Sequence, residues 1–175
     1  NQVAKGETNA KAFEGYAEIL DSLYDLDDIR MYFTTNHDEN SWNGTIGERF
    51  GEAGLLYFVL ASTYGNGMPL IYSGQEMGLD HRLSFFGKDR IEWKKPEIMP
   101  FYTRSLELKH KNPALWNGRY GGPMELIQVD NKDILAYTRI KDDNEVVVFL
   151  NFSDEEQKFS YNMHVKGDYL DWYNG

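Results

Sequence analysis

Two groups of polar side chains stand where a protein could do chemistry. The triplet at residues 36–38 (Asn-His-Asp) follows an apolar run at residues 29–34, and the pair at residues 75–76 (Gln-Glu) follows a second run at residues 68–72. Reactive groups collect at the carboxyl ends of parallel strands, where side chains leave the packed core. A carboxylate beside an imidazole suits acid–base or electrostatic catalysis. The same residues also suit a helix-capping cluster in a polar loop, and spacing alone leaves both interpretations open.

The elements that would position these groups form a crossover. Residues 29–34 and 68–72 are each typical of a buried strand. Between them, Thr45 and Glu48 have capping-box spacing, so a helix is expected to begin there, with a body at residues 53–61 that is apolar nearly all round. Strand, helix and strand in this order predict a parallel crossover unit.

Two further helices flank this unit. Apolar residues between 9 and 24 recur at helical spacing and predict an amphipathic helix. An irregular stretch at residues 78–96 precedes a helix expected at about 100–111, which Asn112 and Pro113 end.

Beyond residue 122 the pattern changes to a period of two, as in an antiparallel sheet. Short strands are expected at residues 124–129, 134–140, 145–152, 157–161 and 169–172. We therefore predict a boundary near residue 120, with an α/β part at 1–119 and an all-β antiparallel part at 120–175.

Composition excludes several classes of function. The net charge of −10 and the sequence pI of about 4.8 argue against a nucleic-acid partner. The absence of cysteine excludes a disulfide scaffold, a thiolate zinc site and a cysteine nucleophile. No apolar run reaches the ~18 residues of a membrane span. The aromatic content of 15% suits both sugar binding and an ordinary core. Because the chain begins without methionine, we expect it to be a piece of a longer protein.

Four segments carry a resemblance to a known family. Residues 33–38 (Phe-Thr-Thr-Asn-His-Asp) resemble the Phe-x-x-Asn-His-Asp segment of the α-amylase family, the family 13 glycoside hydrolases. Residues 67–76 resemble that family's Gly-x-Pro-x-Ile-Tyr-x-Gly-x-Glu stretch on the last barrel strand. Residues 89–93 and 111–118 are similar to the family's segments beyond that strand. Four segments in the right order are a specific signal, whereas a lone Asn-His-Asp would be weak.

The resemblance implies the C-terminal part of a (β/α)₈ TIM barrel, its last two strands with their helices, followed by a small antiparallel β-sandwich domain. It implies that Asp38 is the third catalytic carboxylate, which holds the sugar and stabilises an oxocarbenium-like transition state. It also implies that His37 and Asn36 bind the same sugar. The retaining reaction needs a nucleophile and an acid/base as well, and both are expected upstream, so this chain alone is expected to be inactive.

The aromatic residues and Glu76 are expected to bind substrate or to support the fold. We expect Trp42 and Phe86, which lie in loops beyond strand ends, to bind substrate, with Phe85 a further candidate. Tyr72 and Trp93 are expected to pack, and Glu76 to be a structural hydrogen-bonding residue.

We expect no cofactor and no metal in this chain. The acidic group at residues 21–28 lacks the glycine and terminal glutamate of a calcium loop, although calcium is possible in the longer protein. The histidines are too dispersed along the sequence for transition-metal catalysis.

The resulting hypothesis is a fragment of an α-glucan-active glycosidase acting on starch or maltooligosaccharides, by hydrolysis or by transglycosylation. A non-catalytic sugar-binding module and a purely structural domain are the alternatives. Because strands at the end of a barrel would lack their outer neighbours, we also expect the chain to form a homo-oligomer through exposed edges.

Overall fold

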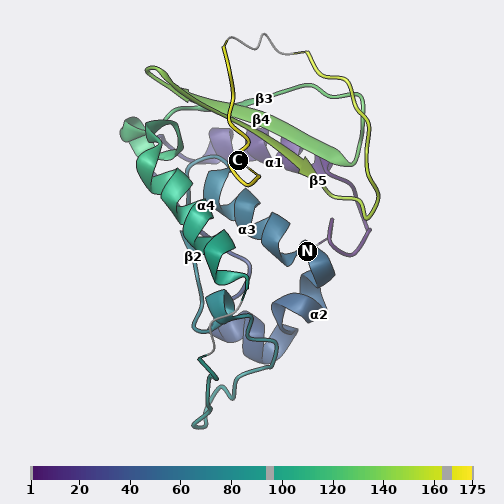
Figure 1. Cartoon of the computed structure of the whole chain (residues 1–175), viewed down its shortest axis with the longest axis vertical. Helices are drawn as coiled ribbons and strands as arrows, with labels where there is room; N and C mark the ends of the chain where they lie inside the picture. The colour runs from purple at the N-terminus through teal and green to yellow at the C-terminus, as the bar shows by residue number, and fades with distance from the viewer. Residues whose placement is uncertain (1, 94–96, 163–166, 175) are drawn as a thin grey trace.

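The computed structural model describes residues 2–93, 97–162 and 167–174. Figure 1 shows an antiparallel sheet at one end, helices beneath it, and a long irregular loop that extends from the other end. The elements are α1 (Lys11–Leu23), β1 (Arg30–Phe33), α2 (Ile46–Phe50), α3 (Gly54–Thr63), β2 (Gly67–Leu70), α4 (Met99–Lys111), β3 (Met124–Leu126), β4 (Ile134–Lys141) and β5 (Asn144–Asn151). No helix in the described part of the chain is long and apolar enough to cross a bilayer.

The predicted parallel crossover is confirmed. β1 and β2 pair in parallel, with Arg30 opposite Gly67 and Phe33 opposite Leu70. The prediction of buried strands is wrong, because Met31 and Phe33 of β1 are 53% and 42% exposed and Met68 of β2 is 45% exposed. Helices cover only one face of this two-stranded sheet, so alternate side chains of β1 face outward.

The helix predicted to begin at Thr45 is divided in two. The capping box is present: the Thr45 hydroxyl accepts from the Glu48 amide at 3.2 Å, and the Glu48 carboxylate accepts from the Thr45 amide at 2.7 Å. A single 3₁₀ turn begins at Gly51, whose φ of +56° lies in the region that favours glycine, and it separates α2 from α3. The expected apolar body of the helix is α3, and most of its residues are buried.

The antiparallel part has three of the five expected strands, in the order β3-β4-β5. Residues 157–161 contribute only an isolated bridge between Tyr161 and Val129, and residues 169–172 form no strand. This last segment lies against α4, where the Tyr173 ring stacks on Phe101 with centroids 5.0 Å apart. The described residues therefore contain one three-stranded sheet and not the two facing sheets of a sandwich.

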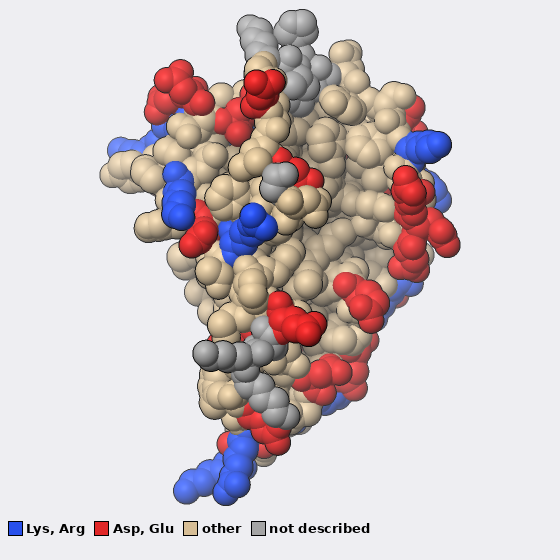
Figure 2. All heavy atoms as spheres, in the orientation of Figure 1, with Lys and Arg blue, Asp and Glu red and all other residues tan. Residues whose placement is uncertain are grey.

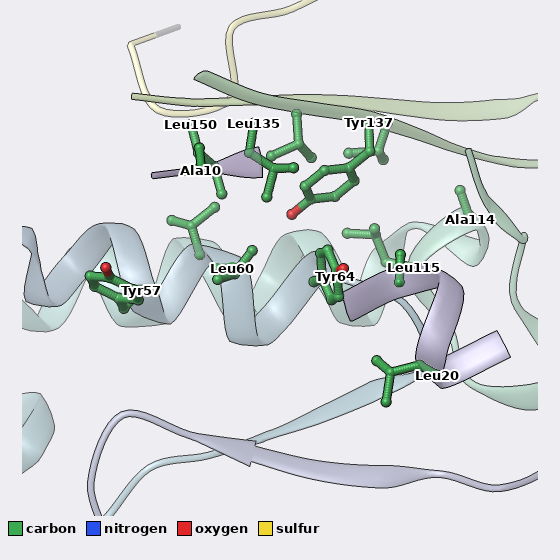
Figure 3. Close-up of a cluster of buried hydrophobic side chains, with 14 residues drawn as sticks. Ala10, Leu20, Tyr57, Leu60, Tyr64, Ala114, Leu115, Leu135, Tyr137 and Leu150 are labelled. Atoms are coloured by element: carbon green, nitrogen blue, oxygen red, sulfur yellow. The ribbon is translucent and has the colours of Figure 1, made fainter. Parts of the chain in front are cut away.

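One hydrophobic core joins the two predicted parts of the chain. Figure 3 shows Leu135, Tyr137 and Leu150 of the antiparallel sheet facing Leu60 of α3 and Tyr64, the residue after that helix, with β1 and β2 on the opposite side of α3. The core contains residues from both sides of the boundary predicted near residue 120.

Two largely buried cations hold the segment that connects these parts. Arg139, only 3% exposed, donates to the carbonyl oxygens of Gly122 and Trp116, each at 2.8 Å from Nη2. The Lys109 ammonium donates to the Leu115 carbonyl oxygen at 2.8 Å. Close approach of the backbone requires glycine, because a Cβ on Gly122 would lie 2.0 Å from the Ile140 oxygen. Burial lowers the pKa of Arg139 to about 10.

Charged side chains are unevenly distributed over the surface. In Figure 2, acidic side chains gather along the right-hand edge of the viewed face, while basic side chains occur in small groups. This distribution agrees with the net charge of −10.

Lys109 makes stability depend on pH. Burial, and then the nearby Arg139 charge, lower the pKa of its ammonium from the usual 10.5 to about 8. Below pH 8 both the folded and the unfolded states hold the proton, and burial of the charge opposes folding. Between about pH 8 and 10.5 the unfolded chain binds more protons, so this group makes the free energy of unfolding rise with pH.

We therefore expect the free energy of unfolding of the wild type, minus that of Lys109→Met, to become more positive between pH 7 and pH 9.5 in urea titrations. Ionisation of tyrosines affects both proteins and cancels in the difference. Lys111→Met is the control, because Lys111 is exposed beside Glu107. Parallel pH curves for the wild type and Lys109→Met would contradict the role of burial.

Candidate active site

Asp38 lies in the segment that leaves β1 at its carboxyl end. Thr34 and Thr35 are buried, and the chain then emerges so that the side chains of His37 and Asp38 are 67% and 59% exposed. The His37 Nε2 lies 3.6 Å from the Asp38 Oδ2. The sequence thus correctly placed this imidazole–carboxylate pair at a strand end.

Asn36 organises the turn that comes next. Its Oδ1 accepts from the Glu39 amide at 2.8 Å, and its carbonyl oxygen accepts from the Asn40 amide at 2.9 Å. The capping interpretation therefore holds for Asn36, whose side-chain oxygen serves the turn. It does not hold for Asp38, which makes no side-chain cap to the π-helical turn Glu39–Asn43.

The two acidic neighbours have different environments. Glu39 binds Arg49, with its Oε2 2.8 Å from Nη2, and both side chains are mostly buried. Asp38 instead presents its carboxylate to solvent beside an imidazole. Of this adjacent pair, Asp38 is the carboxylate available to a ligand.

A loop from residue 79 to residue 93 covers one side of this segment. Asn40, which is buried, accepts from the Leu83 amide at 2.7 Å and donates to the His81 carbonyl oxygen at 3.2 Å. Ser41 donates to the Leu83 carbonyl oxygen at 2.8 Å. Farther along the same face, the Thr45 hydroxyl donates to Asp80 at 2.6 Å. These polar contacts fix where the loop begins.

Asp89 closes the loop. Its carboxylate accepts from the amides of Ser84 at 2.8 Å and Arg90 at 2.7 Å. These backbone hydrogen bonds hold the pKa of Asp89 below its usual range. The same two hydrogen bonds keep the loop turned between residues 84 and 90.

The closed loop assembles an exposed aromatic cluster beside Asp38, which we call the aromatic ledge and define as Trp42, Phe85 and Phe86. The Phe85 ring centroid lies 5.3 Å from Trp42 and 4.8 Å from Phe86, and His37 stacks on Phe85 at 5.9 Å. Trp42 is 58% and Phe86 88% exposed. The structure thus brings the predicted residues together through the ring of Phe85, which the sequence offered only as a further candidate.

The remaining aromatic candidates behave differently. Trp93, expected to pack, is 64% exposed. That expectation is wrong, because residue 93 lies in the irregular loop outside the cores. Tyr72 is half-buried, and its amide donates to Gln75 Oε1 at 3.1 Å.

At the second strand end, Gln75 has the structural role expected of Glu76. The Gln75 amide donates to the Thr34 hydroxyl at 2.9 Å and to the Tyr102 hydroxyl at 3.2 Å, and so ties β1 to α4. Glu76 Oε2 is buried and has no hydrogen-bond partner among the described residues. A structural hydrogen-bonding residue was expected at this strand end and is present, but it is Gln75 and not Glu76.

The acidic group before β1 makes local contacts. Asp27 binds Arg119, and this guanidinium holds the pKa of Asp27 below its usual range. The Asp28 carboxylate accepts from the Asp25 amide at 2.9 Å. Among the described residues, no group of three histidine or acidic side chains is arranged to hold a metal ion.

The structure combines an α/β unit, which has an exposed carboxylate and imidazole at a strand end, with an antiparallel sheet that shares its hydrophobic core. The family model for the C-terminal domain of maltogenic amylase matches residues 124–171. The structure is similar to a maltogenic α-amylase, AmyB, from Thermotoga neapolitana, with a TM-score of 0.72 and 19% identity, over 86% of this chain and 35% of that one.

Two curated relatives are also α-amylases. Alpha-amylase 2 of Dictyoglomus thermophilum is 24% identical over 95% of this chain, and alpha-amylase MalA of Haloarcula japonica is 28% identical over 71% of it. The matched regions span 30% and 18% of those two proteins. The chain is thus similar to α-amylases over most of its length, and its residues 124–171 match the C-terminal domain of maltogenic amylase.

Proposed function

We propose that this chain supplies the transition-state-stabilising carboxylate, Asp38, of a retaining glycosidase that acts on starch-like α-glucans or maltooligosaccharides. The observation that carries the proposal is the exposed Asp38–His37 pair at the carboxyl end of a parallel strand. The glycosidic transition state resembles an oxocarbenium ion, so a fixed anion binds it more strongly than the neutral substrate. His37 would hold the same sugar by a hydrogen bond.

The aromatic ledge gives this site a surface suited to sugar. A pyranose ring presents an apolar face of C–H groups, and exposed aromatic rings bury such faces while leaving the hydroxyls free to hydrogen-bond. Trp42 and Phe86 offer these rings on the side of the segment where His37 stacks on Phe85. A chain of glucose units could therefore lie across Asp38 and the ledge together.

The proposal includes a barrel. β1 and β2 would be the last two strands of a (β/α)₈ barrel, with the nucleophile and the acid/base, ~5–5.5 Å apart, supplied by other strands of the longer protein. A parallel pair with a buried connecting helix and polar strand ends supports this placement. Hydrolysis and transglycosylation use the same three carboxylates, and the acceptor of the glycosyl group distinguishes them.

The 175-residue chain by itself should hydrolyse neither starch nor an aryl α-maltoside. Asp38 supplies electrostatic stabilisation only, and no bond to the anomeric carbon can form without a nucleophile. A chromogenic assay against a no-enzyme control checks this expectation. Turnover that survives repurification would show that a second and third carboxylate lie within this chain.

In the longer protein, Asp38→Asn should lower kcat at least ~100-fold, because it keeps the shape of the side chain and removes the charge that faces the developing cation. His37→Ala should act more mildly, partly through KM. Steady-state kinetics on a maltooligosaccharide measure both. If kcat of Asp38→Asn stays within about threefold of the wild type, Asp38 is not the stabilising carboxylate, and a sugar-binding role for the ledge becomes the better account.

The free edges of the parallel pair support a proposal on assembly. Each strand pairs on one side only among the described residues. A cavity of about 680 Å³ beside β1 is lined by apolar side chains of α1, β1 and α3, and one of about 650 Å³ lies beside β2. Unpaired backbone groups next to apolar cavities recruit another chain. We propose that the isolated chain self-associates through these edges.

Light scattering behind a sizing column at low micromolar concentration should therefore give a mass of at least twice 20.3 kDa. Met31→Lys, which adds a charge on the β1 edge, should shift the chain toward the monomer. Ile19→Lys on α1 is the matched control, since Met31 and Ile19 are each 53% exposed. A stable wild-type monomer with cooperative melting would contradict the proposal.

A further inference from the structure

One guanidinium connects the two ends of the segment that carries Asp38. Arg49, on α2, donates from Nη1 to the Thr34 carbonyl oxygen at 3.0 Å, and its Nη2 lies 2.8 Å from Glu39 Oε2. Its side chain is only 11% exposed. Thr34 is the first residue after β1, and Glu39 directly follows Asp38. The four residues between these anchors include both His37 and Asp38.

His37 and Asp38 depend on these anchors for their position. Both side chains are largely in solvent, and their contacts are with each other at 3.6 Å and, for His37, with the ring of Phe85. Each side chain is thus more exposed than buried. The residues on either side of the segment are more buried: Thr34 is 2% exposed and the Glu39 side chain is 27% exposed. The place of the Asp38 carboxylate therefore depends on what fixes residues 34 and 39, which Arg49 does together with the Asn36 side chain.

We propose that Arg49 is a positioning residue for Asp38, a role that rests on the proposed function of Asp38. A planar guanidinium offers separate N–H groups to a carbonyl and to a carboxylate at once, whereas a single ammonium lacks this fork. Removal of Arg49 leaves the Thr34 carbonyl without this donor and the Glu39 carboxylate without its cation, in a site largely closed to water. The segment can then relax by about an ångström, which is enough to cost ~100-fold in rate.

The test compares Arg49→Met and Arg49→Lys with the wild type in the longer protein. Hydrogen exchange read by mass spectrometry should show at least tenfold faster exchange at residues 36–40 in Arg49→Met, with the amides of α3 and β4 unchanged. Arg119→Met is the control, because Arg119 also binds a carboxylate, that of Asp27, and this pair lies outside residues 34–39.

Kinetics then separate positioning from general stability. For Arg49→Met, kcat should fall ~10–100-fold while KM changes less than threefold, at a temperature where the variant is folded by circular dichroism. Arg49→Lys should recover part of kcat, and Arg119→Met should keep the wild-type value. Unchanged exchange at residues 36–40, or unchanged kcat in Arg49→Met, would overturn the proposal.

An Asp38→Asn variant of the longer protein distinguishes failure of the positioning role from failure of the proposed function. If Asp38→Asn abolishes turnover while Arg49→Met does not, the positioning role is wrong and the proposed function stands. If Asp38→Asn also leaves turnover intact, the proposed function itself is wrong, and the positioning role falls with it.

Discussion

The hydroxyl of Tyr137 on β4 meets the hydroxyl of Thr63 on α3 at 2.6 Å, inside a core where both side chains are buried. The Thr63 hydroxyl donates to the Val59 carbonyl oxygen at 2.7 Å, which leaves Tyr137 as the donor to Thr63. Each buried hydroxyl thus has a partner, and the contact links the antiparallel sheet to the helix. The opposite side of α3 packs on β1 and β2 (Figure 3). A helix buried on two sides is apolar nearly all round, and α3 is so except at its end, where the Ser62 and Thr63 hydroxyls donate to backbone oxygens of the same helix.

A series of hydrogen bonds connects that packing to the candidate site. With α3 fixed, the parallel pairing of β1 and β2 brings their carboxyl ends to one edge, where Gln75 of the second strand end binds the Thr34 side chain of the first. The turn after Asp38 then presents Asn40 to the loop that carries the aromatic ledge. The exposed groups that would meet a sugar are thus ordered by buried groups that would not touch it.

Structural features that depend on residues close together in the sequence could be predicted, and contacts between distant segments could not. Thr45 and Glu48 are three residues apart, so their capping box was visible in the spacing, and the helix over Lys11–Leu23 was visible in its periodicity. The break at Gly51 was not, because a helix interior tolerates an isolated glycine and only its positive φ reveals the turn.

The same distinction applies to the site and to the final strands. The position of His37 and Asp38 after β1 could be predicted, because they follow an apolar run in a recognisable segment. The contact of Trp42 with Phe85 could not, because it depends on hydrogen bonds from Asn40 and Ser41 to residues some forty positions away. Residues 169–172 alternate like a strand, but Trp172 Nε1 donates to the Arg104 carbonyl oxygen on α4 at 2.9 Å. The connecting segment has a related consequence for engineering, because Arg139 contacts the backbone oxygens of Gly122 and Trp116. A Cβ on Gly121 would lie 1.8 Å from the Trp116 oxygen, and one on Gly122 would lie 2.0 Å from the Ile140 oxygen. A chimera that replaces β3–β5 with the strands of a similar protein must therefore keep this arginine and both glycines together.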